Sequence, residues 1–215
     1  MKIRWLGHAS FLITSAAGIR IITDPYSPGG DLDYGEIQET ADIVTVSHDH
    51  FDHSNVDVIG GNPRVVRDVM PLEFKGIGIR GVPTHHDDTG GDQRGNNIIF
   101  CLDIDDISVC HLGDLGHLLT AEQLTEVGAV DVLLIPVGGF FTIDARVASE
   151  VCEQLAPGVV IPMHYKNERC RFPITGVEEF LKDKTGISRR AGSEVELKRE
   201  ALPAPTQIIV LKPAL

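Results

Sequence analysis

Short apolar runs rich in β-branched residues recur along the chain, separated by Gly, Pro, Asp and Asn. Runs of this kind, bounded by turn-forming residues, are typical of β-strands. The pattern predicts strands over residues 19–23, 42–46, 77–82, 97–102, 107–110, 132–135, 159–161 and 208–211. We therefore expect most of the core to come from β-sheet.

Three helix patterns lie between the later strands, each with a polar start and a stop signal. In the middle one, Val147, Val151 and Leu155 recur every four residues and would form one apolar face. The signals are Thr120 with Gln123 and then Gly128, Asp144 and then the turn at 156–158, and Thr175 with Glu178 and then Gly186. Strands early and mixed strand–helix units late indicate an α/β fold with sheets covered by outer helices.

Length and composition fit a single enzyme-sized unit. The 215 residues are 42% hydrophobic, which is enough to bury a full core. Glycines and prolines are spread among turns rather than collected in a linker, and no fixed-period repeat is visible. We expect one domain over residues 1–215.

The charge balance favours a small-molecule substrate over nucleic acid. Asp and Glu (31) outnumber Lys and Arg (19), which gives a net charge of −12. This charge opposes binding to phosphate backbones, although bound dications would add local positive charge and admit a small phosphate-bearing substrate. A homo-oligomer is compatible with this composition.

The cysteines and the first residues indicate a cytoplasmic protein. Cys101, Cys110, Cys152 and Cys170 form no CxxC pair, and we expect free thiols that are mostly buried. Residues 1–15 lack a basic stretch leading into an apolar one. No segment reaches the roughly 18 apolar residues of a membrane span, so we expect no membrane association.

The strongest chemical signal is an HxHxDH motif formed by His48, His50, Asp52 and His53 directly after a predicted strand. Neutral imidazoles and a carboxylate are the ligands that zinc and similar dications prefer. Two histidines at i and i+2 can face one metal from an extended segment, and a following turn can aim the Asp–His pair at a second. Residues 54–55, Ser-Asn, are expected to cap the next helix.

Other polar segments stand in a fixed order around this motif: GHASFLI at 7–13, TDP at 23–25, PTHH at 83–86, HLGD at 111–114 and PMHY at 162–165. Together these segments and the motif resemble the metallo-β-lactamase superfamily. The resemblance implies an αββα sandwich of two mixed β-sheets flanked by helices, with a metal site along one edge of the sheets. Within the superfamily the chain most resembles compact stand-alone metal-dependent hydrolases related to the ascorbate-phosphate lactonases.

The resemblance implies two divalent metal ions, zinc in the first place, with manganese and iron as alternatives. It assigns His48, His50 and one of His85 and His86 to the first metal, Asp52, His53 and His164 to the second, and Asp114 as a bridging carboxylate. Asp24 matches an acidic residue behind the ligand loop that would orient a histidine. As a lone residue before proline, Asp24 would equally suit an ordinary turn.

The third histidine on the first metal requires a choice between neighbours. Adjacent residues at the end of a strand point to opposite sides, so His85 and His86 cannot both reach one ion. Geometry leaves the choice open. The resemblance favours His86, because relatives place a proline and two variable residues before the ligand.

Several further residues fall in family-like segments without matching a ligand position. His8 and His111 are candidates for orienting ligands or relaying protons, with a purely structural role as the alternative. Tyr165 and residues 138–141 are candidates for lining the substrate pocket, although aromatic residues are more often core. Asp87, Asp88 and Asp92 are expected in a mobile, solvated loop without a ligand role.

These features predict a metal-dependent hydrolase of a small ester, lactone or phosphoester. Two dications would hold a bridging hydroxide as the nucleophile, with Asp52 and Asp114 as the catalytic carboxylates. The chain has no GxSxG elbow and no GxxxxGK[ST] phosphate loop. The alternatives are an iron-dependent oxidoreductase of the persulfide dioxygenase type, a non-catalytic metal-binding module and, ranked lowest, a nuclease acting on RNA.

Overall fold

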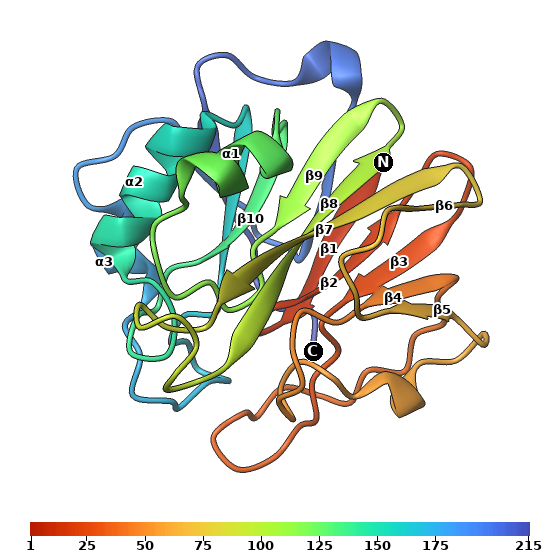
Figure 1. Ribbon diagram of the computed structural model, residues 1–215, viewed down its shortest axis with the longest axis horizontal. Coiled ribbons are helices and arrows are strands. Elements are labelled where there is room, and N and C mark those ends of the chain that lie inside the picture. The colour runs from red at the N-terminus through yellow and green to blue at the C-terminus, as the bar shows by residue number, and fades with distance from the viewer.

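The structure, a computed structural model that describes residues 1–215, contains two stacked β-sheets (Figure 1). The first sheet has six strands in the order β13-β1-β2-β3-β4-β5. Their bounds are β1 Lys2–Gly7, β2 Ser10–Thr14, β3 Arg20–Thr23, β4 Ile43–Thr45, β5 Arg64–Val66 and β13 Glu194–Glu196. The pairs among β13, β1, β2 and β3 are antiparallel, whereas β3, β4 and β5 run parallel. This sheet is therefore mixed.

The second sheet has eight strands in the order β12-β14-β11-β10-β9-β8-β7-β6. Their bounds are β6 Leu72–Phe74, β7 Ile77–His85, β8 Asn96–Ile104, β9 Ile107–His111, β10 Val132–Pro136, β11 Val159–Met163, β12 Ile187–Arg189 and β14 Gln207–Val210. Strands β6 to β9 form an antiparallel meander, and the strands from β9 to β12 in this order are parallel. Both sheets are thus mixed, as expected.

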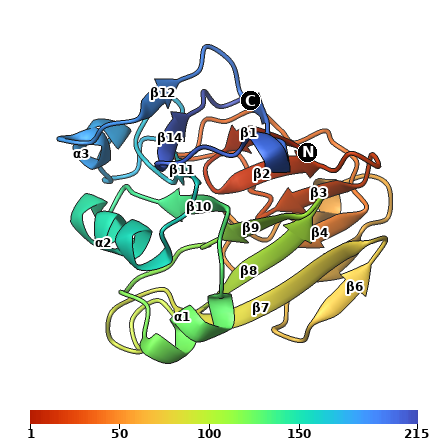
Figure 2. The same cartoon turned by 90° about the horizontal axis from the view of Figure 1, so that it is seen from above.

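Helices cover only the outer face of the eight-stranded sheet (Figure 2). They are α1 Ala121–Val127, α2 Ala145–Leu155 and α3 Val177–Leu181. Helix α2 buries Ala148, Val151 and Leu155, so its apolar face closes this side of the core. None of the three helices has the length and apolar character that a membrane span requires.

A loop, rather than α-helix, covers the outer face of the six-stranded sheet. Residues 24–41 pack Tyr26, Leu32 and Tyr34 against the outward-facing side chains Leu12 and Val44. The only helical turn nearby is the 3-10 segment η1 Val56–Val58. The two-sheet fold is confirmed, and the expected helical layer on this side is replaced by ordered loop.

The main core lies between the two sheets because strand side chains alternate between faces. Ile3, Trp5, Phe11 and Ile13 of the first sheet point inward and are fully or almost fully buried. They meet the apolar strands of the second sheet, of which β10 and β11 are buried at every position. The expected free cysteines are confirmed: Cys101, Cys110 and Cys170 are buried and Cys152 is half-buried.

Every strand predicted from the apolar runs is present, and the first two helices begin as expected. Thr120 and Gln123 form the capping box of α1, and the Asp144 side chain accepts a hydrogen bond from the Val147 backbone N–H at the start of α2. The prediction missed β1, β2, β5, β6, β12 and β13.

Two expected helix starts were wrong. Helix α3 has no side-chain cap, because the Thr175 hydroxyl donates to the Gly138 carbonyl, and the helix ends before Lys182 rather than at Gly186. Ser54 and Asn55 cap no α-helix, because the Ser54 hydroxyl donates to the His50 carbonyl and only η1 follows.

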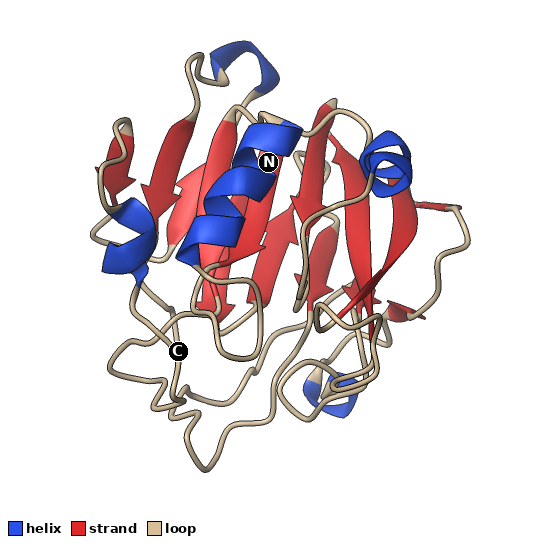
Figure 3. Ribbon diagram, turned by 60° about the vertical axis from the view of Figure 1, so that its left-hand side comes forward, coloured by secondary structure: helices blue, strands red, loops and turns tan.

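Loops gather along one edge of the strands, the lower edge in Figure 3, where the C-terminus also lies. Six polar residues leave the C-terminal ends of strands of both sheets within three residues: His8 after β1, Asp24 after β3, His48 after β4, His86 after β7, Asp114 after β9 and His164 after β11. The His164 backbone N–H donates to the His8 carbonyl and joins the two sheets there. The topology therefore delivers these side chains to one place.

The core packing predicts a large cost for truncation in the middle of β10. Leu134 is fully buried, so Leu134→Ala should lower the free energy of unfolding by about 2–5 kcal/mol through lost contacts and an unfilled cavity. Urea unfolding of the metal-free protein measures this loss. Leu118→Ala, at a side chain 41% exposed, is the control and should change stability by less than about 0.5 kcal/mol. Equal losses in the two variants would contradict the core assignment.

Candidate metal centre

Two groups of metal-ligand side chains meet at this edge. His48, His50 and His86 form one group, and His8, Asp52, His53 and His164 form the other. Within each group the ligand atoms all lie within 4.8 Å of one another. These groups are called cluster A and cluster B below.

Cluster A contains three histidines whose candidate ligand nitrogens lie close together. The His48 Nε2 atom lies 3.0 Å from His50 Nδ1, and the His86 ring lies 4.8 Å from the His48 ring. Burial, followed by the nearby His53, lowers the pKa of His48 to about 3 and keeps this imidazole neutral. A neutral imidazole has a lone pair available for a cation.

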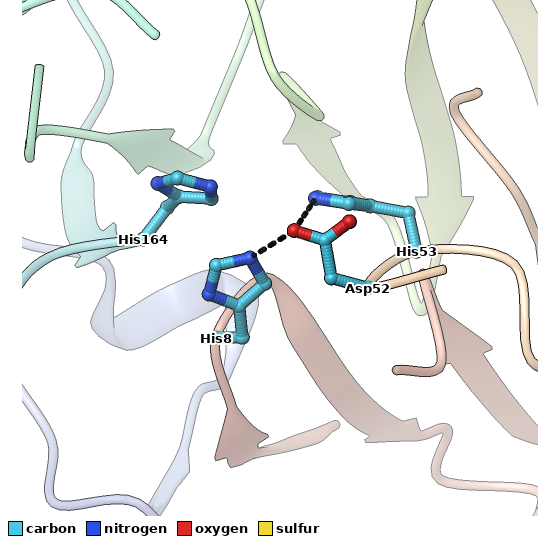
Figure 4. Close-up of side chains that lie close together, drawn as sticks. All are labelled: His8, Asp52, His53 and His164. Carbon is cyan, nitrogen blue, oxygen red and sulfur yellow. Dashed lines mark hydrogen bonds and ion pairs between the residues drawn. The ribbon is translucent and has the colours of Figure 1, made fainter. Parts of the chain in front are cut away.

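Cluster B brings together residues from three distant parts of the chain (Figure 4). His8 Nε2 lies 3.2 Å from Asp52 Oδ2, and the His8 and His164 rings are 4.1 Å apart. His53 Nε2 lies 3.8 Å from the same Asp52 oxygen. All four side chains are buried, so a ligand there would be shielded from bulk water.

Asp114 stands between the clusters. Its Oδ2 atom lies 3.1 Å from His86 Nε2 in cluster A, and 3.3 Å and 3.4 Å from the Nε2 atoms of His53 and His164 in cluster B. It is 3.9 Å from His48 Nε2. One carboxylate oxygen therefore reaches the ligand atoms of both groups, which is the position of a bridging ligand.

Asp24 orients one histidine of each cluster from behind. Its carboxylate accepts hydrogen bonds from His53 Nδ1 at 2.9 Å and from the Ser47 hydroxyl at 2.6 Å. Because the Ser47 hydroxyl donates its proton to Asp24, it can accept one from His48 Nδ1, which lies 2.9 Å away. With Nδ1 protonated in this way, both histidines would offer an unprotonated Nε2 to a bound metal.

The negative charge of the buried carboxylates stabilises positive charge at this edge of the sheets. Burial alone would favour neutral Asp114, but His164 and His53 outweigh it and hold the pKa of Asp114 well below its ordinary value. Burial likewise disfavours a charged His53, yet the facing Asp114 and Asp52 raise the pKa of His53 well above its ordinary value. A charged His53 balances part of the carboxylate charge, and bound cations would balance it more completely.

Three residues of the site have backbone conformations that L-residues rarely adopt. His8, Asp24 and His164 have φ values of 52°, 38° and 49°. Each follows directly after a strand, so the unusual conformation turns the chain at the point where the side chain enters the site. Strain of this kind costs on the order of 1–3 kcal/mol per residue and is typical of functional sites.

Small residues and a buried amide hold the Asp114 loop in place. The Asn97 side chain accepts a hydrogen bond from the Asp114 backbone N–H at 2.9 Å and donates to the Leu112 carbonyl. A Cβ atom at Gly116 would lie 2.2 Å from the Asp87 backbone nitrogen. Only glycine at this position allows the loop to approach His86 closely.

Of the two neighbouring histidines, His86 lies in cluster A and His85 does not. The His85 ring packs 5.7 Å from the His117 ring, and its backbone N–H donates to His117 Nε2. Strand β7 ends at His85, so the two side chains leave on opposite sides. This placement supports the choice of His86, whose role as a ligand stays a prediction.

His111 and Tyr165 lie outside the clusters. His111 Nε2 donates to the Ala9 carbonyl at 2.8 Å, and its Nδ1 accepts from the Gly113 backbone N–H, so this histidine ties the turn before Asp114 to the first sheet. The Tyr165 ring packs 5.2 Å from Trp5 in the core, because it leaves the chain on the side opposite His164. The expectation that Tyr165 lines the substrate pocket was wrong.

A cleft of about 570 Å³ opens over both clusters. Besides His50, Asp52, His86, Asp114 and His164, it is lined by Asp49, Phe51, Gln93, Arg94, Phe141 and Phe172. Phe141 belongs to the segment expected to line a pocket. The sequence did not predict Arg94 and Phe172 in this lining, because no local spacing marks a residue that reaches the cleft through the packing of distant loops.

Asp87 corrects the expectation of a mobile, solvated loop. Its side chain is buried, and its carboxylate accepts hydrogen bonds from the backbone N–H groups of Thr89, Gly91, Gln93 and Arg94 and from the Thr89 hydroxyl. Although desolvation opposes ionisation, these donors hold the pKa of Asp87 below its ordinary value. The Asp-x-Thr-Gly-Gly spacing is a turn signal that could have indicated this structure.

Comparison with known proteins identifies the family. Residues 2–164 match the model of the beta-lactamase superfamily domain. A UPF0173 metal-dependent hydrolase of Thermococcus onnurineus is 30% identical over 191 residues, covering 77% of this chain and 84% of that protein. One of Carboxydothermus hydrogenoformans is 32% identical over 194 residues, with the same coverage.

A solved structure agrees with these relatives. It is a protein of Thermotoga maritima for which zinc-dependent hydrolase activity within the metallo-β-lactamase superfamily has been suggested. It shares 38% identity and a TM-score of 0.81, covering 98% of this chain and 97% of that one. The chain belongs to the β-lactamase superfamily domain family. The expected metallo-β-lactamase-fold hydrolase is thereby confirmed, and its His/Asp clusters can hold metal.

The geometry predicts different outcomes for two neighbouring substitutions. His86→Ala should remove about one equivalent of bound metal, because it leaves cluster A with two of its three histidines. His85→Ala is the matched control and should keep the metal content of the wild type. Mass spectrometry of metal content, with activity as a second readout, checks both variants. Metal loss in His85→Ala alone would transfer the ligand role to His85.

Proposed function

We propose that this protein hydrolyses a small ester, lactone or phosphoester with two divalent metal ions, zinc in the first place. The observation that carries the proposal is the position of Asp114 Oδ2 within 3.1–3.4 Å of ligand nitrogens from both clusters. One metal ion could not be coordinated by both clusters at once, whereas two neighbouring cations would be held together by a shared anionic ligand such as Asp114. Cluster A would hold the first metal, and Asp52, His53 and His164 the second.

The residues fit such ions. The His53 Nε2 and Asp114 Oδ1 atoms are buried without a hydrogen-bond partner, although buried polar atoms normally have one. A coordinated cation would satisfy both. Cations bound here would supply Lewis acidity and a bridging hydroxide as the nucleophile, which is the chemistry that hydrolysis needs.

The chain's own groups would then position the reaction. Asp52 lines the cleft and would orient the attacking oxygen, while His8 holds its Oδ2 atom from the far side. Asp24 would keep His53 in the tautomer with Nε2 free. Phe51, Phe141 and Phe172 would exclude water around the scissile bond.

A small substrate in the cytoplasm suits these features. The net charge of −12 disfavours a polyanionic polymer, and four free cysteines suit a reducing compartment. A cleft of about 570 Å³ has the size of a small-molecule site.

The deciding experiment combines metal analysis with a substrate panel. Protein purified from its native host is analysed for metals and then tested on lactones, esters, thioesters and phosphodiesters. Turnover with two equivalents of zinc or manganese supports the proposal. Stoichiometric iron with oxygen consumption would establish the oxidoreductase instead, and two bound metals without turnover of any substrate would favour a metal-binding module.

Metal counting tests the two-ion arrangement directly. The fully metallated wild type should bind two equivalents, and Asp52→Ala should lose about one, because Asp52 belongs to cluster B only. Native mass spectrometry gives both counts. A wild type that never exceeds one equivalent would rule out the binuclear site.

Asp114→Asn should separate catalysis from folding. A neutral amide keeps the shape of the carboxylate but bridges two cations poorly, so turnover should fall by more than about 100-fold. The Tm of the metal-free variant should change far less than that of a core truncation such as Leu134→Ala. Equal turnover in variant and wild type would remove Asp114 from the site.

A further inference from the structure

Arg94 is a cationic side chain in the cleft that the proposed hydrolysis does not use. It is half-buried and lines both the main cleft and the adjoining groove above His48. The proposed metal ligands His50 and His86 line the same cleft. Arg94 therefore stands where it could contact a substrate bound at the metals.

The guanidinium of Arg94 has no hydrogen bond or ion pair within the chain, although carboxylates are abundant in this acidic protein. Its neighbour in the groove, Arg67, is paired with Asp49 at 2.8 Å. The only partner of the Arg94 guanidinium is the Phe141 ring, whose centroid lies 6.0 Å from the guanidinium carbon. An arginine over an aromatic ring keeps its N–H donors available for an anion.

The loop that carries Arg94 is fixed in advance. The Asp87 carboxylate accepts the Arg94 backbone N–H at 2.8 Å and the Gln93 backbone N–H at 3.0 Å. Asp87 directly follows His86 in the chain, so this loop is anchored beside cluster A. A side chain on a fixed backbone loses less entropy on binding a ligand than one on a mobile loop.

The wall beside Arg94 is apolar. Phe141 and Phe172 both line the cleft, with ring centroids 5.6 Å apart, and Phe51, also in the lining, is 58% exposed. A ligand in contact with this wall and with Arg94 needs an apolar body and an anionic group. A neutral polar ligand would leave the guanidinium desolvated without a partner.

We propose that Arg94 binds a carboxylate or phosphate group of the substrate, which makes the natural substrate a small organic anion with an apolar or aromatic body. The inference rests on the proposed hydrolase function, because it places this anion in the same cleft as the scissile bond. The anionic group lies on the Arg94 side, and the body packs on Phe141 and Phe172.

The test measures binding to the fully metallated protein by calorimetry, with phenyl phosphate, phenylacetate and the neutral phenylacetamide as probes. The variants are Arg94→Gln, Arg94→Lys and Arg64→Gln. Arg64 is the matched control, because it is also an arginine without a side-chain partner but lies exposed at the opposite end of β5 from the site.

Arg94→Gln should weaken binding of at least one anion by about 10- to 100-fold, the loss expected for a charged hydrogen bond. Arg94→Lys should restore part of the affinity, whereas Arg64→Gln should change it by less than about twofold. Phenylacetamide should bind equally to all forms. The anion that loses more affinity identifies the group, and unchanged anion affinity in Arg94→Gln would overturn the proposal.

A kinetic comparison separates this inference from the proposed function. The p-nitrophenyl monoester of succinic acid and its neutral methyl-capped counterpart differ only in the charge of the distal group. Arg94→Gln should raise KM for the charged ester without changing kcat for that ester. Neither constant should change for the neutral ester. Absence of turnover for both esters in the wild type counts against the hydrolase proposal alone, because the binding measurements still report on Arg94. Equal loss of activity on both esters would contradict a role in anion recognition.

Discussion

The candidate metal centre depends on one buried carboxylate, Asp24, that does not itself face the cleft. Asp24 accepts hydrogen bonds from the backbone and hydroxyl of Ser47 and from His53. Burial opposes its ionisation, but the hydrogen bond from His53 and the histidines around it keep its pKa below the ordinary value. A charged, fully buried Asp24 can only accept hydrogen bonds, and this fixes which nitrogen of His53, and through the Ser47 hydroxyl which nitrogen of His48, is left for a metal. The two clusters are thus oriented by a common support.

The site also requires that side chains from both sheets converge on one place. Asp114 comes from the second sheet, whereas His48 and His53 come from the loop after β4 of the first. Their approach to 3–4 Å is set by the stacking of the two sheets and by the close contact of Gly113 with Ser47, where an added Cβ atom would lie 2.6 Å from the Ser47 Cβ. Left-handed backbone at His8 and His164 completes the turn into the site, at a cost that the packed core between the sheets offsets.

The orientation of the ligands and their convergence from two sheets explain which features of the site could be predicted from the sequence. Residues 48–53 were recognisable because their spacing is local, and His86, Asp114 and His164 each lie three or four residues after an apolar run that had been predicted as a strand. The membership of His8 in cluster B was not predictable, since it depends on how β1 lies against β11. The position of Tyr165 failed for a related reason, because one residue of register decides between core and cleft. Helix signals failed where a tertiary partner competed, as the Gly138 carbonyl does for the Thr175 hydroxyl.

The Asp87 loop has a consequence for how such an enzyme can evolve. Its conformation is held by the Asp87 carboxylate, which accepts hydrogen bonds from the Thr89 hydroxyl and from four backbone N–H groups, and every residue except proline supplies such an N–H group. Side chains at Asp88, Asp92 and Gln93 are exposed and can be exchanged without disturbing these bonds. Mutation can therefore alter the rim of the cleft while His86, one residue before the anchor, keeps its place. A fold with this separation between a fixed reaction centre and an exchangeable border can acquire new substrates by single substitutions, which leave the costly ligand geometry untouched.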